Sequence, residues 1–476
     1  MSKSESQQLR VRLVTRDTDY AVSDAPILVP VALKRYGLSE VVNQLLQQQR
    51  EADEENDEEY KHVPFEFLVD GELLRSSLDD TLTAKGLSTE AVLTLEYTRA
   101  VLPPSYLASY SHPDWVAAVD IFQPENADRR YGKANPQDQG VAIDAPIATG
   151  SYDGVVRLWS RAGRVSHQLL AHNAAVKAVK WTAQDRLVSA SADRTLCLWK
   201  TTLPDAEELL GADEEPTLNA NSSIVALLRG HTAAVNNVAV NHLGNIVSAS
   251  ADGTLRVWNT NYKSLPQYEA PVASTSTATQ KRRRIAAAAL PAARTRTSAA
   301  TLSGHSSAVE AVVFHARDAQ TVHSVGQDHT IRTWDLAAGA QIDVRTTQFP
   351  LLAISTLSEL GLLACGSSAR HITLHDPRAG ASATLTQATL VGHTNFVVDL
   401  APSPVSPYML ASASHDGTAR VWDVRAQKCL YVLPRQSGQK GPGGVAAVFG
   451  VDWDKDVGIV SCGKDKQLQI NSSTQF

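Results

Sequence analysis

Histidine, aspartate and serine stand at fixed spacings in this chain, and together they could form a nucleophile with its base. Asp252 follows His231 by 21 residues, and Ser248 and Ser250 lie between them. A serine that is activated by a histidine, itself oriented by an aspartate, is the arrangement of serine hydrolases. The same spacing recurs elsewhere in the chain, however. One active site needs no copies, so the repetition favours an architectural role for these residues.

A tryptophan completes the repeated unit. Trp258 follows Asp252 by six residues, and this interval is kept wherever both residue types occur in the pattern. The segment Gly230–Asn259 contains two short β-rich runs and a tight turn, and it resembles the WD repeat, a four-stranded blade of a β-propeller. Four copies carry the full set, namely His172, Asp193 and Trp199; His231, Asp252 and Trp258; His305, Asp328 and Trp334; and His393, Asp416 and Trp422.

Each of these side chains has a structural task in such a blade. The Asp, in a turn between two strands, accepts hydrogen bonds from turn amides and from the His. The His reaches a strand serine, Ser248 or Ser250 in the third copy, and that serine bonds the indole N–H. A half-buried polar chain is stable only when every member is satisfied, which fixes both residue types and spacing. We therefore expect these residues to hold blades together and to carry no chemistry.

Composition limits the class of protein. The 476 residues carry a formal net charge of −6, and 43% are hydrophobic and 20% charged, as in ordinary soluble proteins. The acidic balance argues against a general nucleic-acid binder. The four cysteines lie far apart without metal-ligand pairing, which is typical of a reducing compartment. No apolar run is long enough to span a membrane, and MSKSESQQ is no signal peptide. We expect an intracellular, soluble chain.

The N-terminal residues 8–98 do not follow the repeat. Alternating apolar residues predict half-buried strands, and Ser39 is expected to cap a helix. Asp70-Gly71 is a strong hairpin signal. The expected strands fall near residues 9–13, 27–31, 65–69 and 93–95. The order β-β-α-β-β resembles a ubiquitin-like β-grasp domain. Residues 51–59 carry seven carboxylates and are expected to form a solvated loop, with a docking site for a basic partner as the alternative.

Counting repeat units predicts a mainly β fold with a seven-bladed propeller over residues 111–476. Five blades have a strong signature. The fifth is degenerate because Ala369 replaces the Asp, and the seventh keeps Asp465 but has Asn471 where Trp is expected. The last repeat is one strand short. We therefore predict that part of the linker at 99–110 supplies the outermost strand of the seventh blade and closes the ring.

Two insertions lengthen the spacing between blades. Residues 202–221 are acidic, and residues 262–299 are rich in Ala, Ser and Thr, so both are expected to be flexible loops. The second insertion contains the basic run Lys281, Arg282, Arg283 and Arg284. This run has three interpretations: a solvated loop, a nuclear import signal or a contact to RNA phosphates.

Three segments narrow the function beyond what a propeller alone would indicate. PFEFLVDGELLRSSL at 64–78, GLSTEAVLTLEYTRAVLPPSYL at 86–107 and HPDWV at 112–116 are similar to the WD-repeat ribosome-biogenesis proteins of the pescadillo–Bop (PeBoW) complex, with an N-terminal ubiquitin-like domain of the NLE type. The resemblance covers the N-terminal domain, the junction and all seven blades. The junction segments are specific, whereas WD signatures alone are not.

The resemblance implies a role in maturation of the large (60S) ribosomal subunit and in pre-rRNA processing, in the nucleus, nucleolus and nucleoplasm. The propeller would bind a Bop-type WD-repeat protein beside a pescadillo-type protein. The AAA ATPase midasin would grip the ubiquitin-like domain and pull the complex off the pre-60S particle. The matching contact is Glu90, preceded by Leu87, Ser88 and Thr89. Its carboxylate would complete a divalent metal site, Mg²⁺ held by midasin, so the chain needs no cofactor of its own.

Three alternatives to this function are an enzyme, a ubiquitin-ligase receptor and a related assembly factor. An enzyme is disfavoured because we find no phosphate-binding loop, metal-ligand cluster or nucleophile elbow. A WD40 substrate receptor of a ubiquitin ligase would need arginines clustered on one face, and Arg157, Arg256 and Arg420 each stand two residues before a blade Trp. A Notchless-type assembly factor has the same N-terminal domain but eight blades, so a count of seven favours the pescadillo–Bop family.

Overall fold

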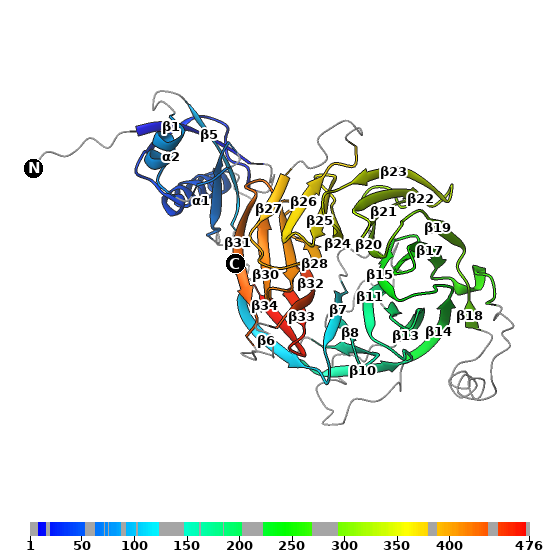
Figure 1. Ribbon diagram of the computed structural model, residues 1–476. Helices are drawn as coiled ribbons and strands as arrows, with labels where there is room; N and C mark the ends of the chain where they lie inside the picture. Colours follow the sequence, from blue (N-terminus) through cyan, green and yellow to red (C-terminus); the bar gives the residue numbers. More distant parts are fainter. Residues whose placement is uncertain are drawn as a thin grey trace, which may run out of the picture. The chain divides into compact units, whose positions relative to one another are not determined.

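The chain folds into two compact units, one up to Pro103 and the other from Pro104 to Ser472 (Figure 1). The structure is a computed structural model. It describes residues 8–15, 20–52, 62–70, 72–74, 76–86, 92–100, 103–122, 147–160, 163–183, 185–201, 222–268, 294–378, 388–436 and 446–472. Among these residues, no helix is both long and apolar enough to cross a membrane.

The N-terminal unit is a five-stranded mixed sheet with a helix packed on it, as expected for a β-grasp. The sheet order is β2-β1-β5-β3-β4, and the central pair β1 and β5 runs parallel. Alternate residues of β1 enter the core with Phe65, Phe67 and Tyr97. Its elements are β1 (Gln8–Val14), β2 (Ile27–Pro30), α1 (Arg35–Ala52), β3 (Phe65–Val69), β4 (Glu72–Leu73), α2 (Leu78–Lys85) and β5 (Leu93–Arg99).

The predicted role of Ser39 as a helix cap is wrong. Helix α1 begins one turn earlier, at Arg35, because its apolar face already starts with Leu38, which is fully buried. Ser39 lies inside the helix, where its Oγ accepts a hydrogen bond from Phe65 N at 3.0 Å. Asn43 adds two bonds to the backbone of Val63. The polar residues of this helix therefore fasten it to the start of β3.

Helix α2 was not predicted, although its end signals are present in the sequence. Ser77 Oγ accepts from Asp80 N, and the Asp80 carboxylate accepts from Ser77 N, which is a complete capping box. Gly86 ends the helix at φ 64°, a left-handed conformation that glycine adopts without strain. Leu78 and Leu82 are buried and attach the helix to the core.

The second unit consists, in its described residues, of seven sheets that form the blades of a propeller, each with four antiparallel strands. The first three blades are β7 (Val116–Ile121), β8 (Ile147–Ser151), β9 (Val155–Trp159) and β10 (Val165–Leu170); β11 (Val176–Ala183), β12 (Arg186–Ser191), β13 (Thr195–Thr201) and β14 (Ser222–Arg229); and β15 (Val235–Val240), β16 (Asn245–Ser250), β17 (Thr254–Asn259) and β19 (Ala300–Ser303).

The remaining four blades repeat this arrangement, with the innermost strand first. They are β20 (Val309–Phe314), β21 (Thr321–Gly326), β22 (Thr330–Asp335) and β23 (Ala340–Thr346); β24 (Leu351–Leu357), β25 (Leu362–Ser367), β26 (His371–His375) and β27 (Ala388–Val391); β28 (Val397–Pro402), β29 (Met409–Ser414), β30 (Thr418–Asp423) and β31 (Lys428–Pro434); and β32 (Val448–Asp454), β33 (Gly458–Gly463), β34 (Gln467–Ser472) and β6 (Ser105–Ser111).

The inner strands close the ring. Each one packs against the next, from β7 through β11, β15, β20, β24, β28 and β32 back to β7 (Figure 1). The seventh blade receives its outermost strand from the start of the unit, because β6 pairs antiparallel with β34 in the register Ile470↔Ala108. Tyr110 of β6 also stacks on Trp159 of the first blade, with ring centroids 5.5 Å apart. This is the closure that the linker sequence predicted.

Both insertions lie inside blades, so the prediction that they lie between blades is wrong: residues 202–221 separate β13 from β14 of blade two, and residues 262–299 separate β17 from β19 of blade three. The second insertion is anchored at both described ends. A short helix, η3 (Tyr262–Ser264), follows β17, and β18 (Thr295–Arg296) adds a fifth strand to blade two, parallel to β14. Arg296 joins the two ends, because its Nε donates to Tyr262 O at 3.2 Å. The insertion therefore leaves and re-enters the propeller at one place on its rim.

We expect deletion of residues 100–110 from the full chain to lower the melting temperature of the propeller by roughly 5 °C or more, since each kcal/mol lost shifts it by about 2–4 °C. The deletion removes β6 and exposes the edge of β34. Leu107→Ala is the matched control, because Leu107 lies on the same strand but is 64% exposed. Differential scanning calorimetry measures both variants. An unchanged melting temperature in the deletion variant contradicts a closing role for β6.

Candidate functional site

The residues with the chemistry of a hydrolase form a closed hydrogen-bond chain inside each regular blade. In blade three, His231 Nδ1 lies 3.0 Å from Asp252 Oδ2, and its Nε2 lies 2.7 Å from Ser248 Oγ. Trp258 Nε1 donates to the same Ser248 Oγ at 2.9 Å. The carboxylate can only accept, so His231 donates from Nδ1 and accepts the serine hydroxyl at Nε2. The serine in the chain is Ser248, not Ser250.

Three further blades have the same chain with nearly the same lengths. The His–Asp distances are 3.0, 2.8 and 2.7 Å and the His–Ser distances 2.8, 2.7 and 2.7 Å, in the order of the sets that follow. The sets are His172, Asp193, Ser189 and Trp199; His305, Asp328, Ser324 and Trp334; and His393, Asp416, Ser412 and Trp422.

Burial keeps substrates away from the serines of all four chains. Ser248 has no exposed surface, so its hydroxyl cannot reach a substrate. Burial opposes ionisation of Asp252, but hydrogen bonds from His231 and Thr254 outweigh it and hold the carboxyl pKa well below its ordinary value. Burial lowers the pKa of His231, which favours the neutral imidazole that the chain requires. Each polar atom in the chain is satisfied internally, which is an architectural state.

Blades one and five have incomplete chains. In blade one, Thr149 takes the serine position, receiving Trp159 Nε1 at 3.0 Å and lying 3.1 Å from His112 Nε2. The Asp153 carboxylate pairs with Arg157 and not with the histidine, with Oδ2 2.7 Å from Arg157 Nη2. In blade five, as the sequence predicted, Ala369 stands at the Asp position. Both blades therefore have the usual strand pairing but only part of the polar hydrogen-bond chain.

Blade seven has an arginine in place of the histidine, which the repeat pattern does not predict. Arg435 forms a two-pronged ion pair with Asp465, Nε to Oδ2 at 2.8 Å and Nη2 to Oδ1 at 2.7 Å, and also donates to Ser461 Oγ. The signal was present but weak. Arg435 directly follows Pro434, the last residue of the outer strand of blade six, at the place where other repeats have Gly-His. A guanidinium has the reach and fork geometry to hold a turn Asp alone.

The arginines before the blade tryptophans do not form a phosphate-binding cluster. Arg256 and Arg420 lie over the glycines of the Gly-His pairs, where a Cβ at Gly230 or Gly392 would lie 2.6 or 2.8 Å from a guanidinium nitrogen. Arg157 is buried and paired with Asp153. Each arginine therefore covers its own blade.

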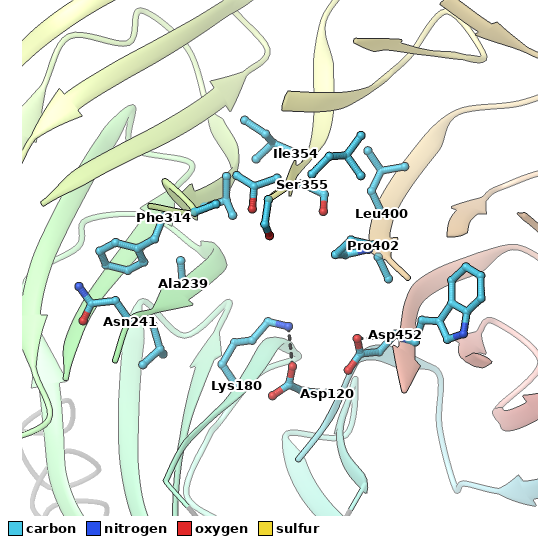
Figure 2. Close-up of a pocket in the computed structure, with 18 of the residues that line it drawn as sticks. Asp120, Lys180, Ala239, Asn241, Phe314, Ile354, Ser355, Leu400, Pro402 and Asp452 are labelled. Carbon is cyan, nitrogen blue, oxygen red and sulfur yellow. Dashed lines mark hydrogen bonds and ion pairs between the residues drawn. The ribbon is translucent and has the colours of Figure 1, made fainter. Parts of the chain in front are cut away.

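A cavity of about 880 Å³ occupies the channel inside the ring, toward the ends of the inner strands (Figure 2). Ile354, Leu400 and Phe314 provide apolar lining, and Lys180 and Asp120 face each other across 2.6 Å. Among the described residues, no group of three or more His, Cys, Asp or Glu side chains is placed to hold a metal ion.

The carboxylates of the channel join neighbouring blades. Asp399 accepts from Val451 N at 2.9 Å, Asp452 from Ile121 N at 2.8 Å, and Asp120 from Trp181 N at 2.8 Å. Each bond links one inner strand to the next, from β28 to β32, β7 and β11. Burial raises the pKa of Asp399 to about 6 in spite of its backbone donors. These carboxylates connect neighbouring blades from inside the channel, so their role is to stabilise the closed ring.

Two sets of predicted residues lie outside the described residues. They are the midasin-binding segment Leu87, Ser88, Thr89 and Glu90, and the basic run Lys281, Arg282, Arg283 and Arg284. The acidic loop at 51–59 and the insertion at 202–221 also fall largely or wholly outside them.

Fold and site together define a WD-repeat propeller preceded by an NLE domain. Residues 9–82 match the NLE (NUC135) domain family, and residues 105–160, 163–200, 222–259, 296–335 and 385–423 match the WD domain, G-beta repeat. The crystal structure of the WD40 β-propeller domain of Doa1 superposes with a TM-score of 0.54 and 17% identity, covering 79% of this chain and 98% of that one. This structural likeness shows the fold.

The relatives specify the family. The ribosome biogenesis protein YTM1 of Candida albicans is 45% identical, covering 98% of both chains, and that of Debaryomyces hansenii is 44% identical, covering 99% of both. The protein of the same name from Yarrowia lipolytica is 45% identical over the full length of both chains. The chain therefore belongs to the YTM1 family of ribosome biogenesis proteins.

We expect Ser248→Ala to destabilise the propeller by about 1–3 kcal/mol, because it leaves His231 Nε2 and Trp258 Nε1 without a partner in a buried site. Denaturant unfolding measures the change. Thr301→Ala, at an exposed position on β19 of the same blade, is the control and should be nearly neutral. Equal stability of both variants, together with labelling of the wild-type chain by a serine-reactive phosphonate, would instead support a hydrolase.

Proposed function

We propose that this protein is a non-enzymatic assembly factor of the large ribosomal subunit that is needed for pre-rRNA processing. The observation that carries the proposal is the similarity, over the whole length, to relatives named ribosome biogenesis proteins. The buried polar chains support it, because the residues with hydrolase chemistry serve the blades and no substrate can reach them. The protein acts by binding other components of the pre-60S particle.

Each unit has its own partner in this proposal. The propeller binds a Bop-type protein within a complex that contains a pescadillo-type protein, and the N-terminal domain is bound by midasin. ATP hydrolysis by midasin then removes the complex from the pre-60S particle. The protein has no metal of its own, and Glu90 completes an Mg²⁺ site that midasin holds, since Mg²⁺ prefers carboxylate oxygens.

The position of Glu90 in the chain supports this role. It lies between α2, whose end is fixed by Gly86, and β5, which begins at Leu93. The segment that contains Glu90 therefore has both ends fixed by elements of the domain, and in this proposal its carboxylate is offered to the partner. The ubiquitin-ligase alternative lacks support, because Arg256 and Arg420 cover glycines of their own blades. Seven sheets in the described residues likewise favour this family over an eight-bladed Notchless-type factor.

We expect Glu90→Ala and Glu90→Gln to fold normally, to keep the pescadillo-type and Bop-type partners, and to lose midasin, so that the complex stays on pre-60S particles. Affinity purification followed by mass spectrometry measures all three outcomes. Glu40→Gln, an exposed carboxylate on α1 of the same domain, is the control and should retain midasin. Equal binding of the wild type and the Glu90 variants to the isolated adhesion-site domain of midasin contradicts the role of Glu90.

The protein is proposed to work in the nucleus, passing through nucleolus and nucleoplasm, and the basic run at 281–284 is the candidate import signal. Replacement of all four basic residues by alanine should shift a fluorescent fusion from the nucleus to the cytoplasm. Import receptors read such basic clusters by charge. Replacement of Arg317, a basic residue outside the run, is the control. Unchanged nuclear accumulation of the alanine variant would leave the run as a solvated loop.

A further inference from the structure

One backbone hydrogen bond marks the same pair of positions in all seven blades, at the face where the inner strands begin. The residue before the turn Asp donates its N–H to the carbonyl of the residue before the inner strand, at 2.8–3.0 Å. The donor and acceptor pairs, in blade order, are Tyr152 and Trp115, Ala192 and Ala175, Ala251 and Ala234, Gln327 and Ala308, Ser368 and Pro350, His415 and Phe396, and Lys464 and Ala447.

The side chains at these positions divide the face into two sectors. Blades two and three carry alanine at both positions, and blade four carries Ala308 and Gln327. Blade five carries Pro350 and Ser368. In blades six and one both positions carry large rings, whereas blade seven carries Ala447 and Lys464, with a further ring from Phe449, the second residue of β32. We call this sector the aromatic arc, and it consists of Phe396, His415, Phe449, Lys464, Trp115 and Tyr152.

The rings of the aromatic arc form one continuous cluster across three blades. His415 lies 6.1 Å from Phe396 and 5.5 Å from Phe449, measured between ring centroids. Phe449 in turn lies 6.0 Å from Tyr152 and 6.3 Å from Trp115. No backbone pairing requires this cluster, because it connects residues of separate sheets through side chains alone.

The repeated backbone hydrogen bond does not need these rings. Blades two and three form the same hydrogen bond with alanine at both positions, so alanine suffices for the turn. The rings also remain in contact with solvent. Tyr152 is 37% and Phe396 43% exposed, while Trp115 and Phe449 are half-buried. Contiguous exposed aromatic side chains are the composition of protein-binding hot spots.

Charge and ring geometry indicate what the aromatic arc binds. Lys464 Nζ lies 5.2 Å from the centre of the Trp115 ring and has no carboxylate partner among the described residues. Lys466, by contrast, approaches Asp114 at 4.0 Å, so its charge is offset. Burial lowers the pKa of His415, so that residue offers a neutral ring. The arc therefore presents one available cation beside an apolar surface, which suits a single carboxylate.

The same features argue against a nucleic-acid strand as the occupant. Single-stranded RNA binds where several cations follow its backbone and ring faces lie open for stacking. Here the Trp115 ring meets Tyr152 at 69° and His415 meets Phe449 at 83°, so these neighbours meet edge to face. Lys464 already lies over one face of Trp115. Such a cluster accommodates an inserted side chain better than a stack of flat bases.

We propose that the aromatic arc is the docking site for an extended segment of a protein partner. The segment places an aromatic or long aliphatic side chain among these rings and a neighbouring carboxylate on Lys464. The site lies wholly within the propeller, so the proposal stands apart from the contact of the N-terminal domain with midasin and goes beyond the proposed assembly role.

An array of immobilised decapeptides, probed with the purified full chain, tests the docking site. One set has Trp, Phe or Leu flanked by Asp or Glu, a second has Lys in place of the acids, and a third has Ala in place of the anchor. Dodeca-uridine is the RNA probe. The acidic set should bind best, and fluorescence anisotropy with its strongest member should show about tenfold or greater weakening for Trp115→Ala and for Tyr152→Ala, as for aromatic hot spots.

Matched variants distinguish a lost contact from a lost fold. Alanine is what blades two and three carry at these positions, so the arc variants should keep the wild-type melting temperature. Gln327→Ala, at the position equivalent to Tyr152 in blade four, should bind the peptide as the wild type does. Lys464→Ala should weaken binding of the acidic peptides and should not weaken binding of those with lysine flanks. Absence of binding to every peptide set, equal affinity of the arc variants and the wild type, or preferential binding of dodeca-uridine each overturns the proposal.

Discussion

The hydrogen bonds between β6 and β34 are the interaction on which the rest of the propeller depends. They supply the seventh blade with its outer strand and join the first strand of the unit to the last. A ring of sheets has no free end only when this pairing is made, and an open end exposes backbone groups that bind other chains. The channel carboxylates add to the closure from inside, since Asp399, Asp452 and Asp120 each cap the backbone of the next inner strand.

The repeats could be predicted from the sequence because each blade meets the same local demands. A buried His needs an Asp on one side and a Ser on the other, and these needs leave a visible spacing. Ser39 was misassigned because a serine before an apolar helical face resembles a cap until the partner of its hydroxyl, Phe65 N, is known. Arg435 was missed because an arginine fulfils the task of a histidine without sharing its spacing. The aromatic arc could not be foreseen, since its rings meet only across three sheets.

Because the blades repeat, each blade is a reference against which the residues of the others can be compared. Where four blades agree, as in the His–Asp–Ser–Trp chains, the shared residues satisfy the fold. Where equivalent positions differ without a change in backbone bonding, as between Ala251 and Tyr152, the fold has left the choice open. The residue types at such positions are then determined by contacts outside the blade. Comparing equivalent positions of the blades therefore distinguishes residues that the fold requires from residues that binding requires. This helps in a protein whose site is not marked by a catalytic group.

The pairing of β6 with β34 also sets the order of events when the chain is made. Ser105 and Ser472, which hydrogen bond at one end of this pair, are 367 residues apart. The middle blades consist of strands close in sequence and can form as they emerge, but β6 is made first and must wait for β34. Contacts between such distant segments form slowly, and an unpaired strand edge is prone to aggregation while it waits. The strand that completes the finished ring is therefore the most vulnerable part of the nascent one.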